Sequence, residues 1–311
     1  MARTRAGIAR TATVMTVSLL SDYGLADGFV GALHCALRAH LPTVPIIDIT
    51  HEVSPCDVRA GSLALLRAAP YLPPGVVLAV VDPGVGTDRR GVALQVAGAE
   101  LSMVGPDNGL LLPAADALGG PQRVVELQDR GYWRPAPGPT FAGRDIFAPA
   151  AAHLAAGGDL LGLGAPLDPG QLVRLAPPRC TRGPDGSCQA EVTWVDRFGN
   201  VQLAAGPAEL PSEAVVLVRA LGPGGPARER KARVVEAFAQ LHEGELGILV
   251  DSYGQLALVF NQASAAAELG AQEGTVVDLL PHPPQDLGSG GPQALGPGRP
   301  PGQFGPQAAY D

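Results

Sequence analysis

Apolar segments of two different periodicities alternate along the first half of the chain. Continuous runs of apolar and β-branched residues, which suit buried strands, occupy residues 16–22, 44–50 and 76–82. Between them, residues 29–41 and 57–72 have the apolar spacing of a helix. Because strands that alternate with helices form mostly parallel sheets covered on both faces, we predict an α/β N-terminal domain.

The pattern changes after a Pro- and Gly-rich segment at residues 164–179. The segments EVTWVD, VVLVRAL, LGILVD and QLALVF follow, separated by turn residues at spacings typical of a small β sandwich or barrel. We therefore predict a boundary near residues 165–180 and a smaller β-rich C-terminal domain. The predicted parts are a disordered extension (1–15), the α/β domain (16–170), the β-rich domain (171–280) and a disordered Pro/Gly-rich tail (281–311).

Charge and hydropathy exclude two classes of partner. The 311 residues have a formal net charge of -8 without long acidic or basic runs. Since nucleic-acid binding requires a basic stripe, we expect no nucleic-acid partner. No apolar run approaches the roughly 20 residues of a membrane helix, so we expect no membrane partner either.

The cysteines indicate neither a metal site nor an oxidising compartment. They form no CxxC pair and have no His at metal-ligand spacing, so a structural zinc is not expected. Cys180 and Cys188 flank a short turn and could meet across a hairpin. We nevertheless expect free thiols in a reducing cytoplasm. The four positions are Cys35, Cys56, Cys180 and Cys188.

The loop VVDPGVGTDRRG, residues 80–91, follows a predicted strand but is not a phosphate-binding loop. It has no Lys followed by Ser or Thr, and the alternating residues 92–96 predict a second strand where a phosphate loop needs a helix. The loop instead places the carboxylate of Asp82 within reach of a guanidinium, that of Arg89 or Arg90. The alternative is an ordinary surface salt bridge.

Similar polar and glycine-rich clusters occur at other predicted strand ends. Alone, each is an ordinary loop, but together at one edge of a sheet they would form a composite site. The five clusters are residues 21–31, 48–58, 82–90, 104–111 and 140–149.

These clusters resemble the family of S-adenosylmethionine (SAM) hydroxide adenosyltransferases and their fluorinating and chlorinating relatives. The resemblance extends from about Thr16 to Leu280 and rests on the motifs SDYG, DPGVGT, PDNGLL, GRDIFAPAAAHLA, DRFGNV and DSYG. It implies an α/β N-terminal domain, a β-rich C-terminal domain and a homotrimer with sites between subunits. It also implies hydrolysis of SAM to adenosine and L-methionine by water attack on ribose C5′, with no metal or other cofactor.

The resemblance assigns catalysis to an Asp, an Arg and a His. The first two match Asp82 and Arg89, which would orient the attacking water. At the third position this chain has Ala142, which neither donates nor accepts a proton. Since a positioned acid or base contributes about 10²- to 10⁴-fold to a rate, we expect slower turnover. His51 and His153 are the alternative sources of an imidazole.

The resemblance also implies the substrate contacts. Asp22 would bind the ribose hydroxyls, and Asn200 and Asn261 would lie on the adenine side. Asp196 would bind the amino group of the methionine part and Ser252 its carboxylate. Phe141 and Phe198 would pack around the nucleoside, and Gly143 matches a small residue of chlorinating relatives. Tyr253 stands where relatives often have Arg.

Other interpretations of the same residues remain open. Phe141 and Phe198 could be ordinary core, Asp107 and Asn108 could cap a turn, and Arg144 could pair internally with Asp145. Two other functions also remain. A chain with Ala142 could bind SAM or adenosine without turnover, and a halogenase could use chloride or fluoride. Halogenating relatives have Tyr where this chain has Asp82, a carboxylate that would repel a halide.

Overall fold

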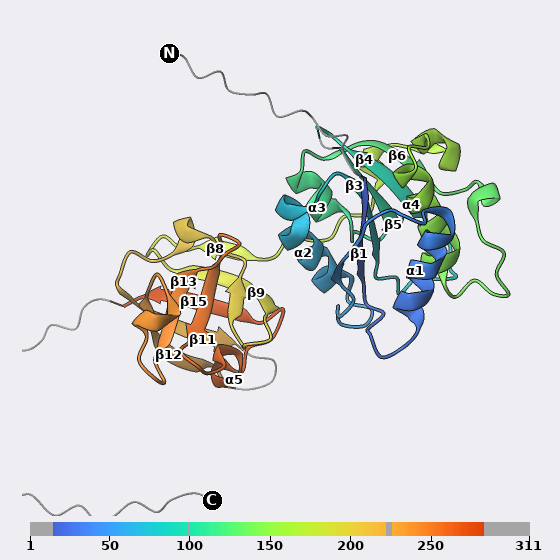
Figure 1. The fold of residues 1–311 in the computed structure, drawn as a ribbon. Helices are drawn as coiled ribbons and strands as arrows, with labels where there is room; N and C mark the ends of the chain where they lie inside the picture. The colour runs from blue at the N-terminus through green and yellow to red at the C-terminus, as the bar shows by residue number, and fades with distance from the viewer. Residues whose placement is uncertain (1–14, 99, 222–225, 283–311) are drawn as a thin grey trace, which may run out of the picture.

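The computed structural model describes residues 15–98, 100–221 and 226–282. Almost all of the predicted N-terminal extension and C-terminal tail lies outside these residues. In the described part, the chain forms a sheet with flanking helices followed by a β-barrel (Figure 1). The predicted fold class is confirmed.

The N-terminal sheet has seven strands in the order β2-β1-β3-β5-β4-β6-β7. The pairings β2–β1, β1–β3 and β3–β5 are parallel, as predicted, whereas β4, β6 and β7 are joined by antiparallel pairings. Only residues 97–100 connect β4 to β5, too few for the crossover that parallel neighbours need. The strands are β1 (Thr16–Ser21), β2 (Ile46–Thr50), β3 (Gly75–Val80), β4 (Gly91–Val96), β5 (Leu101–Pro106), β6 (Pro121–Glu126) and β7 (Pro166–Leu167).

Helices cover both faces of this sheet because its central strands are apolar on both sides. Val76, Leu78 and Val80 of β3 pack into one buried cluster with α1 and α4, whereas Val77 and Ala79 pack into another with α2 and α3. Figure 1 shows these two pairs of helices on opposite sides of the sheet. The helices are α1 (Phe29–His40), α2 (Val58–Ala68), α3 (Leu112–Ala117) and α4 (Ala148–Ala155), the last preceded by a π-helical turn (Gly143–Phe147).

The C-terminal domain is a closed seven-stranded barrel with an additional edge strand. It closes because β10 pairs with both β14 and β9, and β8 extends the sheet beyond β9. Strand β12 is not predicted from the sequence because its residues, RERKARV, are mostly charged and exposed. The elements are β8 (Cys180–Arg182), β9 (Cys188–Val195), β10 (Val201–Leu203), β11 (Val215–Leu221), β12 (Arg228–Val234), β13 (Leu246–Val250), β14 (Leu256–Phe260), α5 (Ala265–Leu269) and β15 (Val276–Pro281).

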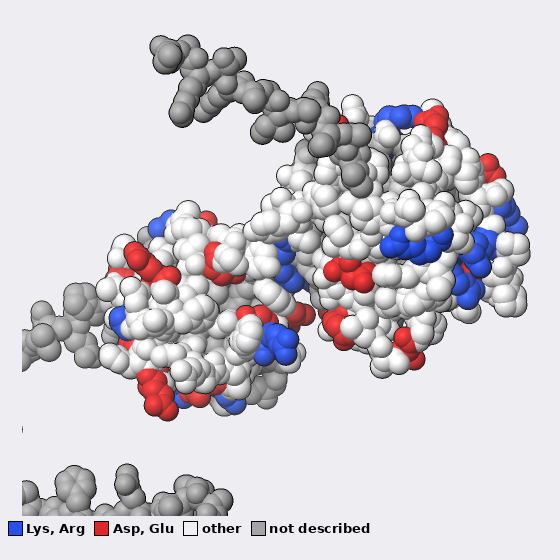
Figure 2. Space-filling model, viewed as in Figure 1, with Lys and Arg blue, Asp and Glu red and all other residues white. Residues whose placement is uncertain are grey.

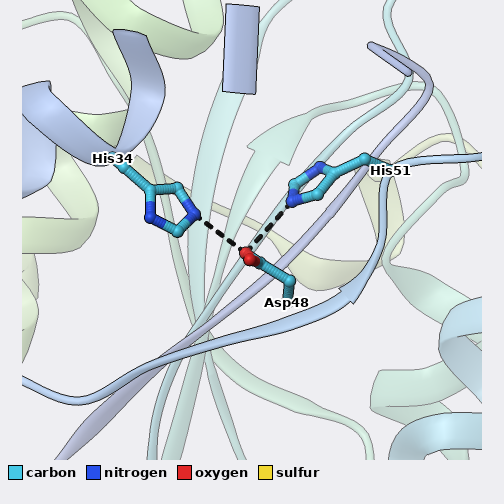
Figure 3. Close-up of side chains that lie close together, drawn as sticks. All are labelled: His34, Asp48 and His51. Carbon is cyan, nitrogen blue, oxygen red and sulfur yellow. Dashed lines mark hydrogen bonds and ion pairs between the residues drawn. The ribbon is translucent and has the colours of Figure 1, made fainter. Parts of the chain in front are cut away.

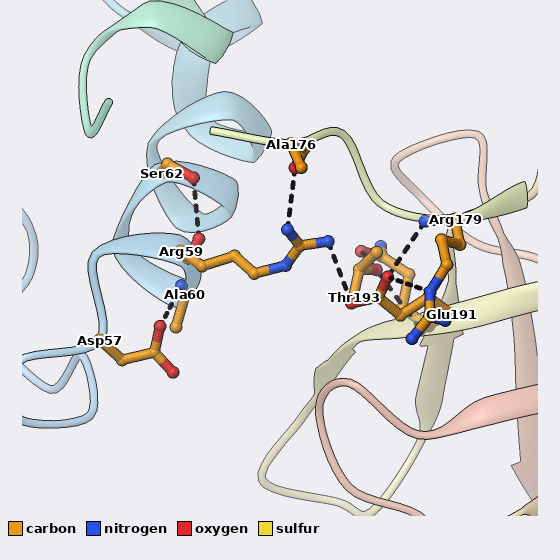
Figure 4. Close-up of polar contacts among 9 residues, drawn as sticks. Asp57, Arg59, Ala60, Ser62, Ala176, Arg179, Glu191 and Thr193 are labelled. Atoms are coloured by element: carbon orange, nitrogen blue, oxygen red, sulfur yellow. Dashed lines mark hydrogen bonds and ion pairs between the residues drawn. The ribbon is translucent and has the colours of Figure 1, made fainter. Parts of the chain in front are cut away.

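Arg59 on α2 connects the two domains (Figure 4). Its guanidinium donates to the carbonyl of Ala176 at 2.8 Å and to the buried carboxylate of Glu191 on β9 at 3.0 Å. The other oxygen of that carboxylate accepts the backbone N–H of Arg179 at 3.0 Å. The predicted domain boundary between residues 170 and 171 falls within the segment that joins β7 to β8.

The thiols, the surface charges and the lengths of the helices also relate to the predictions from the sequence. All four cysteines are free, and burial, followed by the neighbouring Cys180, raises the pKa of Cys188 to about 12. On the face shown in Figure 2, acidic and basic side chains are interspersed among uncharged residues. None of the described helices is long and apolar enough to span a membrane.

Candidate active site

The carboxyl ends of β1, β2, β3 and β5 meet at one edge of the sheet because these strands are parallel. Backbone and side-chain contacts join the loops that follow them. Gly24 donates its N–H to the carbonyl of His51 at 2.7 Å, and Asn108 donates its side-chain amide to the carbonyl of Val81 at 2.8 Å. Four of the five clusters singled out in the sequence therefore lie together.

Asp82 and Arg89 form a two-point ion pair in the loop after β3. Nε of Arg89 lies 2.9 Å from Oδ1 of Asp82, and Nη2 lies 2.5 Å from Oδ2. The Asp82 side chain is 6% exposed and that of Arg89 14%, so this is not the exposed pair of the alternative interpretation. Burial raises the pKa of Asp82 above its usual value, and Arg89 offsets only part of that rise.

The neighbouring Arg90 has a structural role. It donates from Nε and Nη2 to one carboxylate oxygen of Asp107, at 2.9 and 2.6 Å. The other oxygen of Asp107 accepts the backbone N–H of Val173, in the segment that leads to the barrel. Asn108 accepts the N–H of Leu110, as expected of a residue that caps a turn.

A buried hydrogen-bond network holds the turn after β1, which contains Asp22 and Tyr23. The Tyr23 N–H donates to Oγ of Ser21 at 3.2 Å, and that oxygen lies 2.7 Å from Nδ1 of the buried His51. Asp22 accepts the N–H of Cys56 at 2.8 Å through Oδ2. The network thus fixes the backbone on both sides of the predicted ribose-binding carboxylate.

The same network ends in a carboxylate between two imidazoles (Figure 3). Oδ1 of Asp48 lies 2.9 Å from Nε2 of His34 and 3.1 Å from Nε2 of His51. Burial raises the pKa of Asp48, but the hydrogen bonds from His51 and His34 outweigh burial and the net pKa is below the usual value. Among the described residues, these three side chains form a set that could hold a transition metal, with ligand atoms within 4.8 Å of one another. Their mutual hydrogen bonds already explain the arrangement.

The cluster at residues 140–149 reaches this edge through aromatic contacts. The ring of Phe141 lies edge-on to Tyr23, 5.5 Å between centroids, and edge-on to Phe29 at 5.2 Å. Phe141 is therefore a half-buried member of a surface aromatic group. Arg144 and Asp145 pair with each other at 2.7 and 2.8 Å, as the alternative interpretation predicted.

Tyr23 also belongs to this site, although the sequence motifs predict no role for it. Its hydroxyl lies against Gly143, where an added Cβ would be 2.2 Å from the oxygen. Burial raises the pKa of Tyr23, and the charges of Asp22, Asp82 and Asp145 raise it further. The SDYG motif contains the phenol, but only the tertiary contact shows where its hydroxyl lies.

Among the described residues, no imidazole takes the place of the one expected at Ala142. Ala142 is buried and lines a cavity of about 640 Å³ together with Arg89 and Asp145. His153 lies on α4, where its Nε2 donates to the backbone carbonyl of Asp159 at 3.0 Å and its ring packs against Tyr132. His51 is already hydrogen-bonded to Ser21 and Asp48 beside the turn that contains Asp22.

The predicted substrate residues of the C-terminal domain form a second group. Asp196, Asn200 and Ser252 line one cavity of about 490 Å³ beside the barrel. Asp196 accepts the N–H groups of Phe198 and Asn200 and the Asn200 side-chain amide, at 2.8 to 2.9 Å. Phe198 is 72% exposed, so the alternative that it is ordinary core is wrong. Asn261 does not line this cavity and donates to the carbonyl of Leu241.

The two groups lie apart in the main cavities of the described residues. None of the described cavities combines Asp22, Asp82, Arg89, Phe141 or Gly143 with Asp196, Asn200 or Ser252. Among the described residues, the predicted site residues therefore form two groups, named here the sheet half (Asp22, Asp82, Arg89, Phe141 and Gly143) and the barrel half (Asp196, Asn200 and Ser252).

Two family models match the chain in consecutive parts. The SAM hydroxide adenosyltransferase N-terminal domain matches residues 17–164, and the C-terminal domain of that family matches residues 190–278. The chain belongs to the SAM hydroxide adenosyltransferase family. The two matches correspond to the helix-flanked sheet and to the barrel of this adenosyltransferase fold.

Several named relatives align with this chain over most of their own length. The (R)-S-adenosyl-L-methionine hydrolase of Salinispora tropica is 49% identical over 83% of this chain and 95% of its own length. The hydrolase of the same name from Thermus thermophilus is 41% identical, over 85% and 99%. A fluorinase from Actinopolyspora mzabensis is 27% identical, over 84% and 95%. The solved structure of an uncharacterised conserved protein from Thermotoga maritima has a TM-score of 0.78 at 34% identity, over 86% and 100%.

Proposed function

We propose that the protein hydrolyses SAM to adenosine and L-methionine. Water attacks ribose C5′, a C–O bond forms, and the C5′–S bond breaks with its electron pair going to sulfur. The positively charged sulfonium thereby becomes the neutral thioether of methionine, and the proton of the water passes to a base. The buried pair of Asp82 and Arg89 at the sheet edge is the observation that supports this reaction most directly.

Asp82 is the group that orients the water and accepts its proton. A sulfonium leaves readily, so catalysis depends on holding water in line behind C5′ and excluding bulk solvent. Arg89 fixes both oxygens of the carboxylate, because its Nε and Nη2 bind one oxygen each. The carboxylate also balances the positive charge of the substrate. This chemistry uses no metal or other cofactor.

Two half-sites in one chain support a homotrimer with active sites between subunits. The sheet half would supply Asp22 for the ribose, and the barrel half of a neighbouring copy would supply Asp196 and Asn200. Large apolar side chains are exposed beside both halves, Phe29 at 47% and Phe198 at 72%. A subunit contact there would cover these rings and exclude water from the substrate. The free cysteines support a reducing cytoplasm as the location.

A protein that binds SAM or adenosine without turnover is the second candidate. Ala142 favours this function because it leaves the cavity beside Arg89 without the family imidazole. Halogenation is disfavoured by the carboxylates of Asp22, Asp82 and Asp145, which together act on Tyr23. A halide in the same space would meet this negative charge.

Incubation of the purified protein with SAM, with and without chloride, tests the proposal. Adenosine and methionine, separated by chromatography, are expected in equal amounts and independently of chloride. The Ala142→His variant is expected to form them faster. Tight SAM binding by calorimetry with no product from the unmodified protein would instead establish the binding function, and 5′-chloro-5′-deoxyadenosine would establish halogenation.

A further inference from the structure

Tyr23 directly follows Asp22 in the turn after β1, and its hydroxyl reaches the segment that begins at Gly143. It lies against the backbone of Gly143, since a Cβ built there would be 2.2 Å from the hydroxyl oxygen and 3.2 Å from Cζ. The charges of Asp22, Asp82 and Asp145 all act on this phenol. The hydroxyl thus occupies the space that a side chain at position 143 would fill.

The Tyr23 side chain is held from both ends. Its ring packs against Phe29 and Phe141, with centroids 5.9 and 5.5 Å away. Its backbone N–H donates to Ser21, which in turn lies 2.7 Å from the buried His51. A hydroxyl on such a support is preorganised, because neither the ring nor the backbone has to be ordered when substrate binds.

The hydroxyl supplies a hydrogen-bond donor that the neighbouring carboxylates lack. Ionised carboxylates only accept hydrogen bonds, and two of the Arg89 donors are already engaged by Asp82. Burial and the surrounding negative charge keep the phenol protonated, because its pKa is raised. The hydrogen bonds found among the described residues leave its hydrogen free for a molecule in the site.

We infer that the Tyr23 hydroxyl donates a hydrogen bond to the water that attacks C5′, an inference that rests on the proposed hydrolysis. Three contacts then fix the orientation of the water molecule. One of its hydrogens points to Asp82, one lone pair accepts from Tyr23, and the other lone pair faces C5′. Tyr23 therefore supplies a positioning contact for the nucleophile in a chain that has Ala142 in place of the family imidazole.

The Tyr23→Phe variant tests the inference because it removes the oxygen and keeps the ring packing. We expect kcat for adenosine formation to fall about 10- to 100-fold while the Kd of SAM is unchanged. Tyr132→Phe, which removes a phenol that packs against His153, is the control and should retain the kcat of the unmodified protein. An unchanged kcat in Tyr23→Phe, or a loss seen only in Kd, would overturn the inference.

The contact with Gly143 provides an independent test. The Gly143→Ala variant places a methyl group where the hydroxyl lies, so we expect it to lower kcat in the unmodified protein and much less in Tyr23→Phe. Fully additive losses would overturn the inference. If the unmodified protein forms no adenosine, the proposed hydrolysis itself fails. If it forms adenosine and Tyr23→Phe is equally fast, only the role of Tyr23 fails.

Discussion

Arg89 binds both oxygens of the Asp82 carboxylate, from Nε at 2.9 Å and from Nη2 at 2.5 Å, at the carboxyl end of a central strand. The two residues are separated by a loop of only six residues, 83–88, so the loop itself sets their distance. Each oxygen of a carboxylate fixed in this way keeps a remaining lone pair in a fixed direction. In the proposed reaction this pair positions the attacking water molecule, and the following predictions depend on it.

Replacement of Asp82 by Asn keeps the shape of the side chain and removes its charge and basicity. We expect adenosine formation to fall about 10²- to 10⁴-fold. In the unmodified protein the carboxylate must be ionised, and burial raises its pKa above the ordinary 3.8. The rate should therefore rise with pH through that raised pKa and then level off. A rate profile that is the same in the Asp82→Asn variant would contradict this role.

Replacement of Arg89 by Met leaves the Asp82 carboxylate buried without its partner. We expect a loss of about 3 kcal/mol in the free energy of unfolding, measured with urea, together with a lower kcat. Arg90→Met is the matched control, because it likewise removes the partner of a buried carboxylate, Asp107. It should lose similar stability while the folded protein keeps its kcat. Equal kcat values in both variants would show that the Asp82 pair is structural.

Replacement of His51 by Gln breaks the network under the Asp22 turn, since Gln cannot contact Ser21 and Asp48 at the same time. We expect unfolding free energy to fall by about 1–3 kcal/mol and SAM to bind more weakly. His34→Gln is the control, because the His34 side chain is 33% exposed and lies at the outer end of the network. If calorimetry shows the same SAM affinity in His51→Gln as in the unmodified protein, the network does not contribute to substrate binding.

A shared site predicts complementation between two inactive variants. Asp82→Asn damages the sheet half and Asp196→Asn the barrel half. The two variants are mixed in equal amounts to form mixed trimers. A site between two neighbouring subunits is intact when one of them supplies an undamaged sheet half and the other supplies an undamaged barrel half. With random assembly this holds for about a quarter of the sites, so about a quarter of the activity should return after the variants are unfolded and refolded together. Continued inactivity of the mixture would place each site within a single subunit.

The apolar patterns of short segments correctly predicted the central strands and the loop that follows β3. The apolar runs at 16–22 and 76–82 became β1 and β3, and the loop after β3 brought Asp82 to Arg89 as expected. The parallel order then placed four predicted loops at one edge. These features depend on periodicity and on short loops, which a sequence displays directly.

Contacts between distant segments were not predictable in the same way. Arg90 binds Asp107 because β4 lies antiparallel to β5, a pairing that neither residue indicates. The hydroxyl of Tyr23 lies over Gly143 because two loops pack together, although 120 positions separate them in the sequence. The charged segment β12 was not predicted as a strand because it has no apolar pattern of its own. It forms a strand because it pairs with neighbouring strands of the barrel.

The origin of the oxygen in the adenosine product tests the central claim most directly. The protein is incubated with SAM in water labelled with heavy oxygen, and the products are examined by mass spectrometry. Attack of water on C5′ predicts that the 5′-hydroxyl of adenosine contains the heavy oxygen and that methionine remains unlabelled. Adenosine without the label, or the absence of adenosine, would contradict hydrolysis directed by Asp82 at C5′.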